Sequence, residues 1–275
     1  MPRKIQGHIQ GHIQGQLQGQ LQGLAGKHAL ITGGSSGIGA AIARTLGSEG
    51  AAISIAGRRM ALLEAVAAQI PGAKAMAVDV TDEGACLAMV AAARAAHGPV
   101  DILIANAGGA ESAPAAKADL GHWQRMINVN LTGAFLSVKA ALPDVTRKDA
   151  HGGRIVFIAS TAGLKGYPYI AAYCAAKHGV VGLARALAAE LAPSGVTVNA
   201  VCPGYTLTPL LEASLANIMA KTGRTRREAE ADLMRHNPQG RFVQPEEVAR
   251  SVLWLCTPWA QSVTGQAISV SGGET

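Results

Sequence analysis

The sequence has few cysteines, and their placement excludes a disulfide-based design. Only four occur in 275 residues, Cys86, Cys174, Cys202 and Cys256, and no two form a C-x-x-C pair. The N-terminus also lacks the apolar core of a signal peptide. We therefore expect free thiols in a reducing cytoplasm.

The chain also lacks an uninterrupted hydrophobic run and a concentrated basic patch. Two uncharged stretches, 191–211 and 251–273, reach membrane-spanning length, but prolines, glycines and polar side chains interrupt both. We expect them to be strands and loops, with no membrane partner. The net charge of +6 is not gathered in arginine-aromatic clusters, which argues against nucleic acid and favours phosphate-bearing cofactors or substrates.

Size and composition favour one globular domain with a short appendage, since 49% of the residues are hydrophobic and both charge signs are present. Residues 6–23 repeat every four positions, and the glycines of this repeat make a helix unfavourable. We interpret residues 1–23 as a low-complexity, mobile arm and residues 24–275 as the domain. Without a helix, His8 and His12 are not expected to hold a metal, and no other metal site is predicted.

From Lys27 onward, short β-branched runs alternate with longer alanine-rich helical runs. The expected strands lie at 28–32, 51–56, 74–78, 101–106, 154–160, 196–201 and 266–270, and the expected helices at 37–49, 60–70, 83–96, 123–145 and 169–191. This alternation is typical of βαβ units. We predict an α/β fold: a single doubly wound Rossmann-type domain with about seven parallel strands flanked by helices.

A glycine-rich turn stands between the first strand and the first helix. The stretch "LITGGSSGIGAAIA" places Thr32, Gly33, Gly37 and Gly39 there. Glycines allow the backbone to approach a pyrophosphate, and the helix N-terminus offers free N–H groups and a positive dipole end. A glycine-rich turn can be a simple tight loop, but the flanking strand and helix predict dinucleotide binding.

Three of the four tyrosines lie between Lys165 and Lys177, and one has the spacing that acid–base chemistry needs. A side chain that donates or removes a proton in catalysis works best with a pKa near the working pH. A free tyrosine, with a pKa of about 10, needs a nearby cation to exchange protons near neutral pH. Tyr173 and Lys177 are four residues apart at a helix start and share one face, whereas Tyr169 and Tyr167 lack such a partner.

Taken together, the motifs resemble those of the short-chain dehydrogenase/reductase family over about residues 24–273. The matching motifs are the loop T-G-x-x-x-G-x-G from Thr32, N-A-G from Asn106, V-N-L-T-G around Asn130, Ser160 thirteen residues before Tyr173, and P-G-Y-T-L-T-P from Pro203. The resemblance implies an NAD(P)-dependent oxidoreductase that interconverts a ketone and a secondary alcohol. It also implies a homotetramer.

The resemblance assigns four catalytic residues. Ser160 would hydrogen-bond the substrate oxygen, and Tyr173 would donate or remove the proton. Lys177 would lower the pKa of Tyr173 and hold the nicotinamide ribose, while Asn130 would position a water that relays protons to Lys177. Thr161 is a rival hydroxyl, but neighbouring strand residues face opposite sides, and the thirteen-residue spacing favours Ser160.

The end of the second strand favours NADP over NAD. An acidic residue there would bind the ribose 2′-hydroxyl, whereas Arg58 and Arg59 can pair with a 2′-phosphate. Two solvated arginines and NAD remain the alternative, because Ser35 and Ser36 stand where many NADP-using relatives carry a basic residue. The resemblance implies that the cofactor meets Thr32, Gly33, Ser35, Ser36, Gly37, Ile38, Gly39, Arg58, Arg59, Asp79, Val80, Asn106, Ala107, Gly108, Tyr173, Lys177, Pro203, Gly204, Thr206 and Thr208.

The substrate is the least defined part of the prediction. Expected pocket residues are Tyr167, Tyr169, Ile170, Tyr205 and Leu210. Bacterial β-ketoacyl-carrier-protein reductases usually have glutamine where Ile170 stands, so the chain looks more like polyketide ketoreductases and 3-hydroxyacyl-CoA or 3-hydroxybutyrate dehydrogenases. We expect a 3-oxoacyl thioester or related carbonyl substrate beneath a lid at about 207–243. The basic residues of this lid would hold a phosphate-bearing thioester, or would form a solvated helix face.

Other functions remain open from the sequence. One is an NAD-dependent dehydrogenase of a 3-hydroxy acid or another secondary alcohol. An epimerase or dehydratase of sugar nucleotides would need a longer C-terminal domain and a G-x-x-G-x-x-G loop, which this chain lacks. A non-catalytic dinucleotide sensor or scaffold predicts loss of a catalytic residue, yet all four are present.

Overall fold

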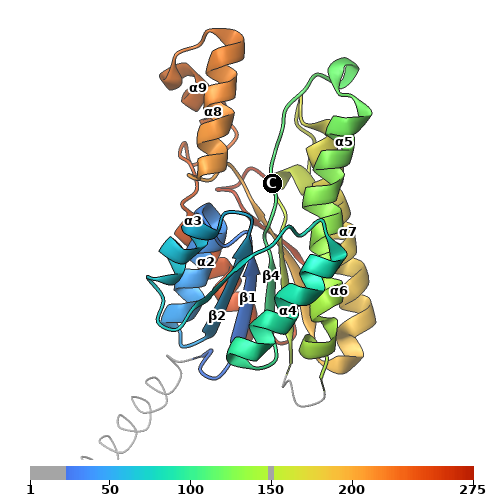
Figure 1. Cartoon of the computed structure of the whole chain (residues 1–275). Helices are drawn as coiled ribbons and strands as arrows, with labels where there is room; N and C mark the ends of the chain where they lie inside the picture. The colour runs from blue at the N-terminus through green and yellow to red at the C-terminus, as the bar shows by residue number, and fades with distance from the viewer. Residues whose placement is uncertain (1–22, 148–151) are drawn as a thin grey trace, which may run out of the picture.

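The computed structural model describes residues 23–147 and 152–275. Within them, one sheet of parallel strands has the order β3-β2-β1-β4-β5-β6-β7 (Figure 1). The strands are β1 (His28–Thr32), β2 (Ala52–Gly57), β3 (Lys74–Ala77), β4 (Ile102–Ala105), β5 (Arg154–Ile158), β6 (Thr197–Pro203) and β7 (Ala267–Val270). The predicted doubly wound α/β fold is confirmed. The predicted arm at 1–23 lies outside the described residues, apart from Gly23.

Helices cover both faces of the sheet, which explains why its central strands read as continuous apolar runs. The covering helices are α2 (Gly37–Ser48), α3 (Met60–Ala67), α4 (Glu83–His97), α6 (Gly133–Val145), α7 (Ala171–Leu191) and α10 (Pro245–Cys256). In β1, Leu30 packs into the core shared with α4, α6 and α7, whereas the next residue, Ile31, packs into the core shared with α2 and α10. No helix in these residues is long and apolar enough to cross a membrane.

Two predicted helices differ from the observed ones. The helix expected over 123–145 consists of α5 (Leu120–Ile127), a π-helical segment (Asn128–Thr132) and α6. π-helical turns are rare and occur frequently at functional sites, and this one contains Asn130. The helix expected from Tyr169 begins at Ala171, because Tyr169 has a left-handed backbone with a φ of 68°.

The segment expected as a lid forms two helices, α8 (Pro209–Thr222) and α9 (Arg226–Met234), which project beyond the carboxyl end of the sheet (Figure 1). These helices have a small apolar core of their own, made of Leu211, Leu215, Ala229, Leu233 and Phe242. Two backbone hydrogen bonds close the base of the lid, from Leu207 N to Val243 O (2.9 Å) and from Val243 N to Tyr205 O (2.9 Å). The expected lid is therefore a compact unit that is joined to the domain at its base and also contacts Ser112 through Asn217 and Lys221.

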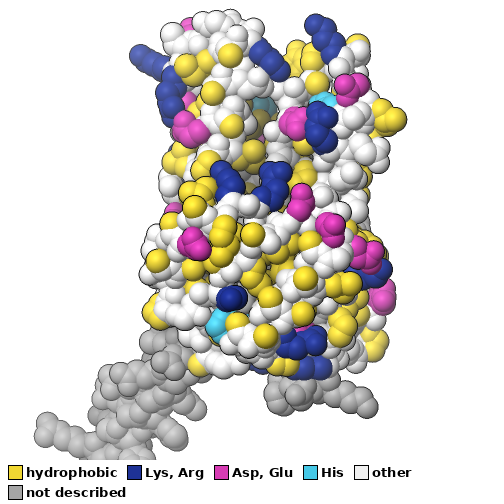
Figure 2. All heavy atoms as spheres, in the orientation of Figure 1, with side chains coloured by type: hydrophobic (Ala, Val, Ile, Leu, Met, Phe, Trp, Pro, Cys, Tyr) yellow, Lys and Arg dark blue, Asp and Glu magenta, His cyan; other side chains and the backbone are white. Residues whose placement is uncertain are grey.

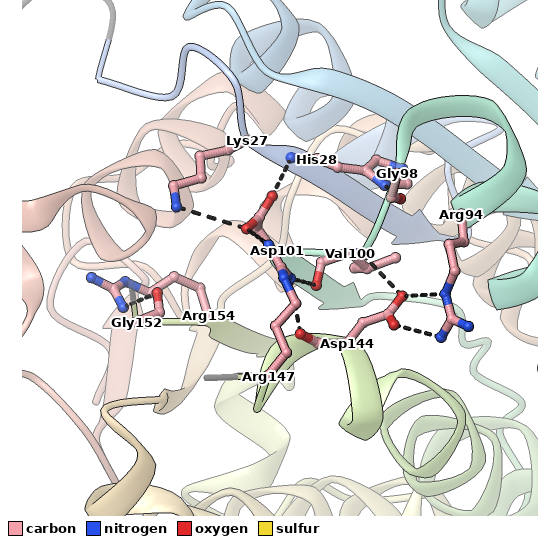
Figure 3. A network of polar contacts seen from close by, with 10 residues as sticks. All are labelled: Lys27, His28, Arg94, Gly98, Val100, Asp101, Asp144, Arg147, Gly152 and Arg154. Carbon is pink, nitrogen blue, oxygen red and sulfur yellow. Dashed lines mark hydrogen bonds and ion pairs between the residues drawn. The ribbon is translucent and has the colours of Figure 1, made fainter. Parts of the chain in front are cut away.

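Two buried carboxylates tie the amino ends of the strands to the neighbouring helices (Figure 3). Asp101 accepts hydrogen bonds from His28 N at 2.8 Å and from Arg147 Nη2 at 2.7 Å. Asp144, in α6, is paired with Arg94 of α4 at 2.5 Å. Buried carboxylates need such partners, so these groups stabilise the amino ends of the strands. In a doubly wound sheet the ligand site is expected at the carboxyl ends.

Candidate active site

A cleft of about 320 Å³ lies at the carboxyl ends of the strands, between the glycine-rich turn, the start of α7 and the start of α8. Figure 2 shows the molecule hollowed between the lid and the tip of α5, with basic side chains at the lower end of the hollow. Predicted site residues that line this cleft are Gly33, Ser35, Ser36, Gly37, Ile38, Gly39, Arg58, Arg59, Asp79, Val80, Asn106, Ala107, Gly108, Asn130, Tyr173, Lys177, Thr208 and Leu210.

Four predicted cofactor residues lie behind the cleft wall rather than on it. Thr32 is buried, and its Oγ1 accepts hydrogen bonds from the backbone N–H groups of Asn106 and Ala107, both at 3.1 Å. Thr206 is buried and donates to Gly204 O at 2.9 Å, and Pro203 ends β6. These residues hold the loops that form the cleft.

The glycines of the turn are required by close packing. Gly33 has a φ of 67°, and a Cβ at Gly39 would lie 2.3 Å from Gly33 O. Asn106 Nδ2 donates to Thr32 O at 2.9 Å and to Gly33 O at 3.1 Å, which fixes the turn against β4. α2 then begins at Gly37 without a side-chain cap at Ser36 and without an acidic residue in its first turn. Its positive end therefore suits a pyrophosphate.

Arg59 occupies a position that spacing alone does not reveal. Its Nη2 lies 3.5 Å from Ser35 Oγ and 3.4 Å from Ser36 Oγ, so the guanidinium bends back over the glycine-rich turn. The glycine-rich turn contains no basic residue of its own, but the Arg59 guanidinium places a positive charge beside it. Asp79 is turned toward Thr81, whose hydrogen bonds lower the Asp79 pKa, with a smaller contribution from Arg58.

Tyr173 and Lys177 meet on one face of α7, as their spacing predicts. Lys177 Nζ lies 5.6 Å from the centre of the Tyr173 ring and donates a hydrogen bond to Ile158 O at 2.8 Å. Burial lowers the pKa of Lys177 to about 8 and raises the pKa of Tyr173 to about 12, and a hydrogen bond with Ser160 opposes the second shift. We expected Lys177 to lower the Tyr173 pKa; in this structure burial raises that pKa, and the contribution that opposes burial comes from Ser160.

Asn130 holds the backbone beside Lys177. Its Nδ2 donates to Gly109 O at 2.8 Å and to Met126 O at 3.0 Å, and its Oδ1 accepts from Gly109 N at 3.2 Å. A Cβ at Gly108 would lie 2.6 Å from Asn130 Oδ1 and 3.7 Å from Lys177 Nζ, so Gly108 lies close to both side chains and leaves no room for a larger residue. The water relay between Asn130 and Lys177 stays a prediction.

The expected substrate residues are spread over different surroundings, and of these five only Leu210 lines the described cleft. Tyr169 is 64% exposed, and Ile170 is half-buried as it precedes α7. The hydroxyl of Tyr167 lies 2.5 Å from Glu274 Oε1, and the ring of Tyr205 packs edge-on against Tyr167. The sequence analysis missed Glu274. The sequence shows it only as a lone acidic residue after the last strand, which does not indicate a role in the site.

Most of the basic residues of the lid are paired with carboxylates. Arg224 and Arg235 pair with Asp232, Arg226 with Glu212 and Glu230, and Arg241 with Glu247. Lys221 Nζ lies 3.4 Å from Ser112 O. These pairs weaken the hypothesis that the lid holds a phosphate-bearing thioester and favour a solvated helix face.

Comparisons with known proteins agree with this geometry. The sequence model of the short chain dehydrogenases matches residues 27–218. A putative ketoacyl reductase of Streptomyces coelicolor is 40% identical, over 89% of this chain and 95% of that protein. A D-beta-hydroxybutyrate dehydrogenase of Rhizobium meliloti is 38% identical, over 90% of this chain and 98% of that protein. The crystal structure of a variant actinorhodin polyketide ketoreductase with NADPH, 39% identical, superimposes with a TM-score of 0.86 over 90% of this chain and 97% of that one.

Proposed function

Because the chain belongs to the short-chain dehydrogenase family and is therefore an NAD(P)-dependent enzyme that interconverts ketones and secondary alcohols, we propose that it is an NADP-dependent reductase of a 3-oxoacyl thioester or a related carbonyl compound. One observation carries the reaction: Tyr173 lines the dinucleotide cleft with the ammonium of Lys177 5.6 Å from its ring centre, and Ser160 is near enough to lower the Tyr173 pKa. The similarity to ketoacyl and polyketide ketoreductases supports the substrate class.

The described residues fit a nicotinamide dinucleotide. The positive end of α2 and the glycine-rich turn would hold its pyrophosphate, and Lys177 would hold its nicotinamide ribose. Arg59, bent toward Ser35 and Ser36, would pair with the 2′-phosphate that distinguishes NADP. The reduced nicotinamide, when bound, supplies a hydride to the carbonyl carbon.

The protein's own groups handle the proton. Ser160 would donate a hydrogen bond to the carbonyl oxygen and orient it toward the Tyr173 hydroxyl. Tyr173, protonated at neutral pH because burial raises its pKa to about 12, would donate its proton as charge develops on that oxygen. Lys177, with a pKa of about 8, is mostly an ammonium at neutral pH and would stabilise the resulting phenolate. We keep the proposal that Asn130 positions a water for proton return.

An NAD-dependent dehydrogenase of a 3-hydroxy acid is the second candidate. The similarity to the D-beta-hydroxybutyrate dehydrogenase of Rhizobium meliloti supports it. The two candidates differ in cofactor and direction, because this dehydrogenase would use NAD to oxidise a hydroxy acid. Arg59 beside the glycine-rich turn favours the NADP-dependent reductase.

We also propose a homotetramer in the cytoplasm. Strand β7 ends the sheet with apolar residues that are only partly buried, and Trp254 and Trp259 are exposed nearby, which suits contact with another copy. The four cysteines are free and buried, as in a reducing compartment. Light scattering after size exclusion tests the assembly, and a monomer mass would overturn it.

The function is tested with purified full-length protein and a panel of 3-oxoacyl thioesters, small ketones and 3-hydroxy acids. Each is assayed with NADPH and NADH, or with the oxidised cofactors, at 340 nm. The proposal expects turnover of an oxoacyl thioester with a higher kcat/KM for NADPH. Activity confined to hydroxy acids with NAD would favour the second candidate, and no turnover of any carbonyl or alcohol would refute both.

A further inference from the structure

A buried carboxylate lies outside the cleft and is not used by the mechanism above. Glu274 belongs to the segment after β7, and its side chain is only 1% exposed. Its Oε1 lies 2.5 Å from the Tyr167 hydroxyl, 3.1 Å from Lys165 Nζ and 3.7 Å from His236 Nδ1. Its Oε2 is buried without a hydrogen-bond partner among the residues that the structure describes. A buried charge of this kind is retained only where its neighbours compensate it.

These partners come from separate parts of the chain. Lys165 and Tyr167 follow the short helical turn 161–163 after β5, whereas His236 lies just after α9 at the base of the lid. In Figure 1 the C-terminal end lies above the carboxyl ends of the strands, between the lid helices and α5. Glu274 is therefore the point at which the lid and the turn after β5 meet.

The contact with Tyr167 continues to the turn that carries Ser160. The Tyr167 hydroxyl also lies 2.7 Å from Thr161 Oγ1. A phenol has one proton and an ionised carboxylate can only accept, so Tyr167 donates to Glu274 and Thr161 donates to Tyr167. Thr161 directly follows Ser160, whose Oγ accepts a hydrogen bond from Ala162 N at 3.1 Å. The chain of hydrogen bonds thus fixes the backbone next to Ser160.

The contact with the lid is made by an aromatic cluster around the same carboxylate. The His236 ring lies 5.5 Å from the Tyr167 ring and 5.6 Å from the Tyr205 ring, between centroids. Burial, followed by the neighbouring Glu274, raises the pKa of Tyr205 to about 12. A Cβ at Gly272 would lie 2.0 Å from Asn237 Oδ1, so the segment before Glu274 also packs tightly against the base of the lid.

We propose that Glu274 is a positioning residue for carbonyl reduction, which fixes the Ser160 turn through Tyr167 and Thr161 and holds the base of the lid against that turn through His236. The inference rests on the proposed function for its catalytic consequence. Its structural consequence, that the turn and the lid base are ordered together, is independent of which substrate is reduced.

The kinetic test compares wild type, Glu274→Gln and Ser160→Ala, alone and combined. Glu274→Gln keeps the side-chain volume but loses the charge, and we expect kcat to fall by roughly tenfold, since small misplacements of catalytic groups have large effects on rate. The Kd for NADPH, measured by its fluorescence, should change less than about twofold, because Glu274 lies away from the dinucleotide cleft. In the Ser160→Ala background, Glu274→Gln should have almost no further effect on kcat.

Glu83→Gln is the matched control, because Glu83 forms an exposed ion pair with Lys139 on α6, and it should leave kcat unchanged. Tyr167→Phe removes the hydroxyl and keeps the ring, so it carries the same test if Glu274→Gln folds poorly. An unchanged kcat in both variants would overturn the proposal. So would an equal loss of kcat with and without Ser160, because Glu274 would then act by another route.

Hydrogen exchange supplies a readout that needs no turnover. Glu274→Gln should speed deuterium uptake in peptides covering 160–169 and in peptides covering 235–243, whereas Glu83→Gln should change neither. Unchanged uptake in both regions would refute the positioning role even in an active enzyme. A different result would be faster uptake in Glu274→Gln together with a wild-type protein that reduces no carbonyl compound. That result would refute the proposed function, but the coupling of lid and turn would stand.

Discussion

The ammonium of Lys177 lies 5.6 Å from the ring centre of Tyr173, one turn further along α7. Since the Tyr173 pKa is about 12, the phenol stays protonated at neutral pH. Alcohol oxidation needs the phenolate, and the ionised fraction of Tyr173 rises about tenfold per pH unit. The Lys177 charge that stabilises this phenolate is lost near pH 8. We expect oxidation rates to rise steeply up to about pH 8 and less steeply above it, in initial-rate profiles. Oxidation rates independent of pH from about 6 to 8 would contradict this assignment.

The buried charge of Lys177 is expected to lower the free energy of unfolding, and replacing this lysine with an apolar residue should restore that free energy. Its pKa falls from 10.5 in the unfolded chain to about 8, so the folded state binds fewer protons between these values. Lys177→Met should therefore raise the free energy of unfolding by about 1–3 kcal/mol at neutral pH while abolishing activity. Denaturant unfolding should show this gain shrinking from pH 8 toward 10.5, as the wild-type lysine loses its proton. A variant less stable than wild type at pH 7 would be evidence against this cost.

Arg59 is expected to discriminate between the two cofactors. A charge-assisted hydrogen bond to a 2′-phosphate contributes about 1.5–3 kcal/mol, so Arg59→Ala should raise KM for NADPH about ten- to a hundredfold. KM for NADH should change by less than about threefold, since that cofactor has no 2′-phosphate. Arg44→Ala, an exposed arginine of α2 that contacts Gln69, serves as the control. Equal effects on both cofactors would exclude the pairing.

Asp101 supports the end of the sheet opposite to the cleft. Asp101→Asn weakens its ion pair with the partly exposed Arg147, and we expect a loss of about 2–3 kcal/mol in the free energy of unfolding. Thermal unfolding should register a lower Tm, while kcat per folded molecule should stay at the wild-type value because the cleft is remote. Loss of kcat in fully folded Asp101→Asn would show that the two ends of the sheet are coupled.

The fold could be predicted because each strand can be recognised from its own short stretch of sequence. Strands such as β1 are buried on both faces and read as short apolar runs, and the predicted seven-strand parallel sheet is the observed one. The helix boundaries were less predictable. The π-helical segment around Asn130 has no local sequence signal. Tyr169 has a left-handed backbone, which non-glycine residues rarely adopt, so its sequence does not indicate this conformation.

Residue spacing alone predicted only the parts of the site that are close in sequence, whereas the family resemblance supplied cleft residues from other segments, such as Asn106 and Asn130. The spacing of Tyr173 and Lys177 gives their common face directly, and the glycine-rich turn gives the end of α2. Two contacts between distant segments were not accessible from either source. Arg59 reaches Ser35 across the end of the sheet, and Glu274 reaches Tyr167 over 107 positions, so only the folded chain shows that these groups meet.

Tyr173→Phe, assayed with NADPH and the best carbonyl substrate of the wild-type enzyme, tests the catalytic assignment most directly. The substitution removes one hydroxyl and keeps the ring, so NADPH affinity and Tm should stay near their wild-type values. Loss of general acid catalysis should lower kcat by about 10²–10⁴-fold. A variant that keeps the wild-type kcat would show that another group donates the proton, and the proposed role of Tyr173 would be wrong.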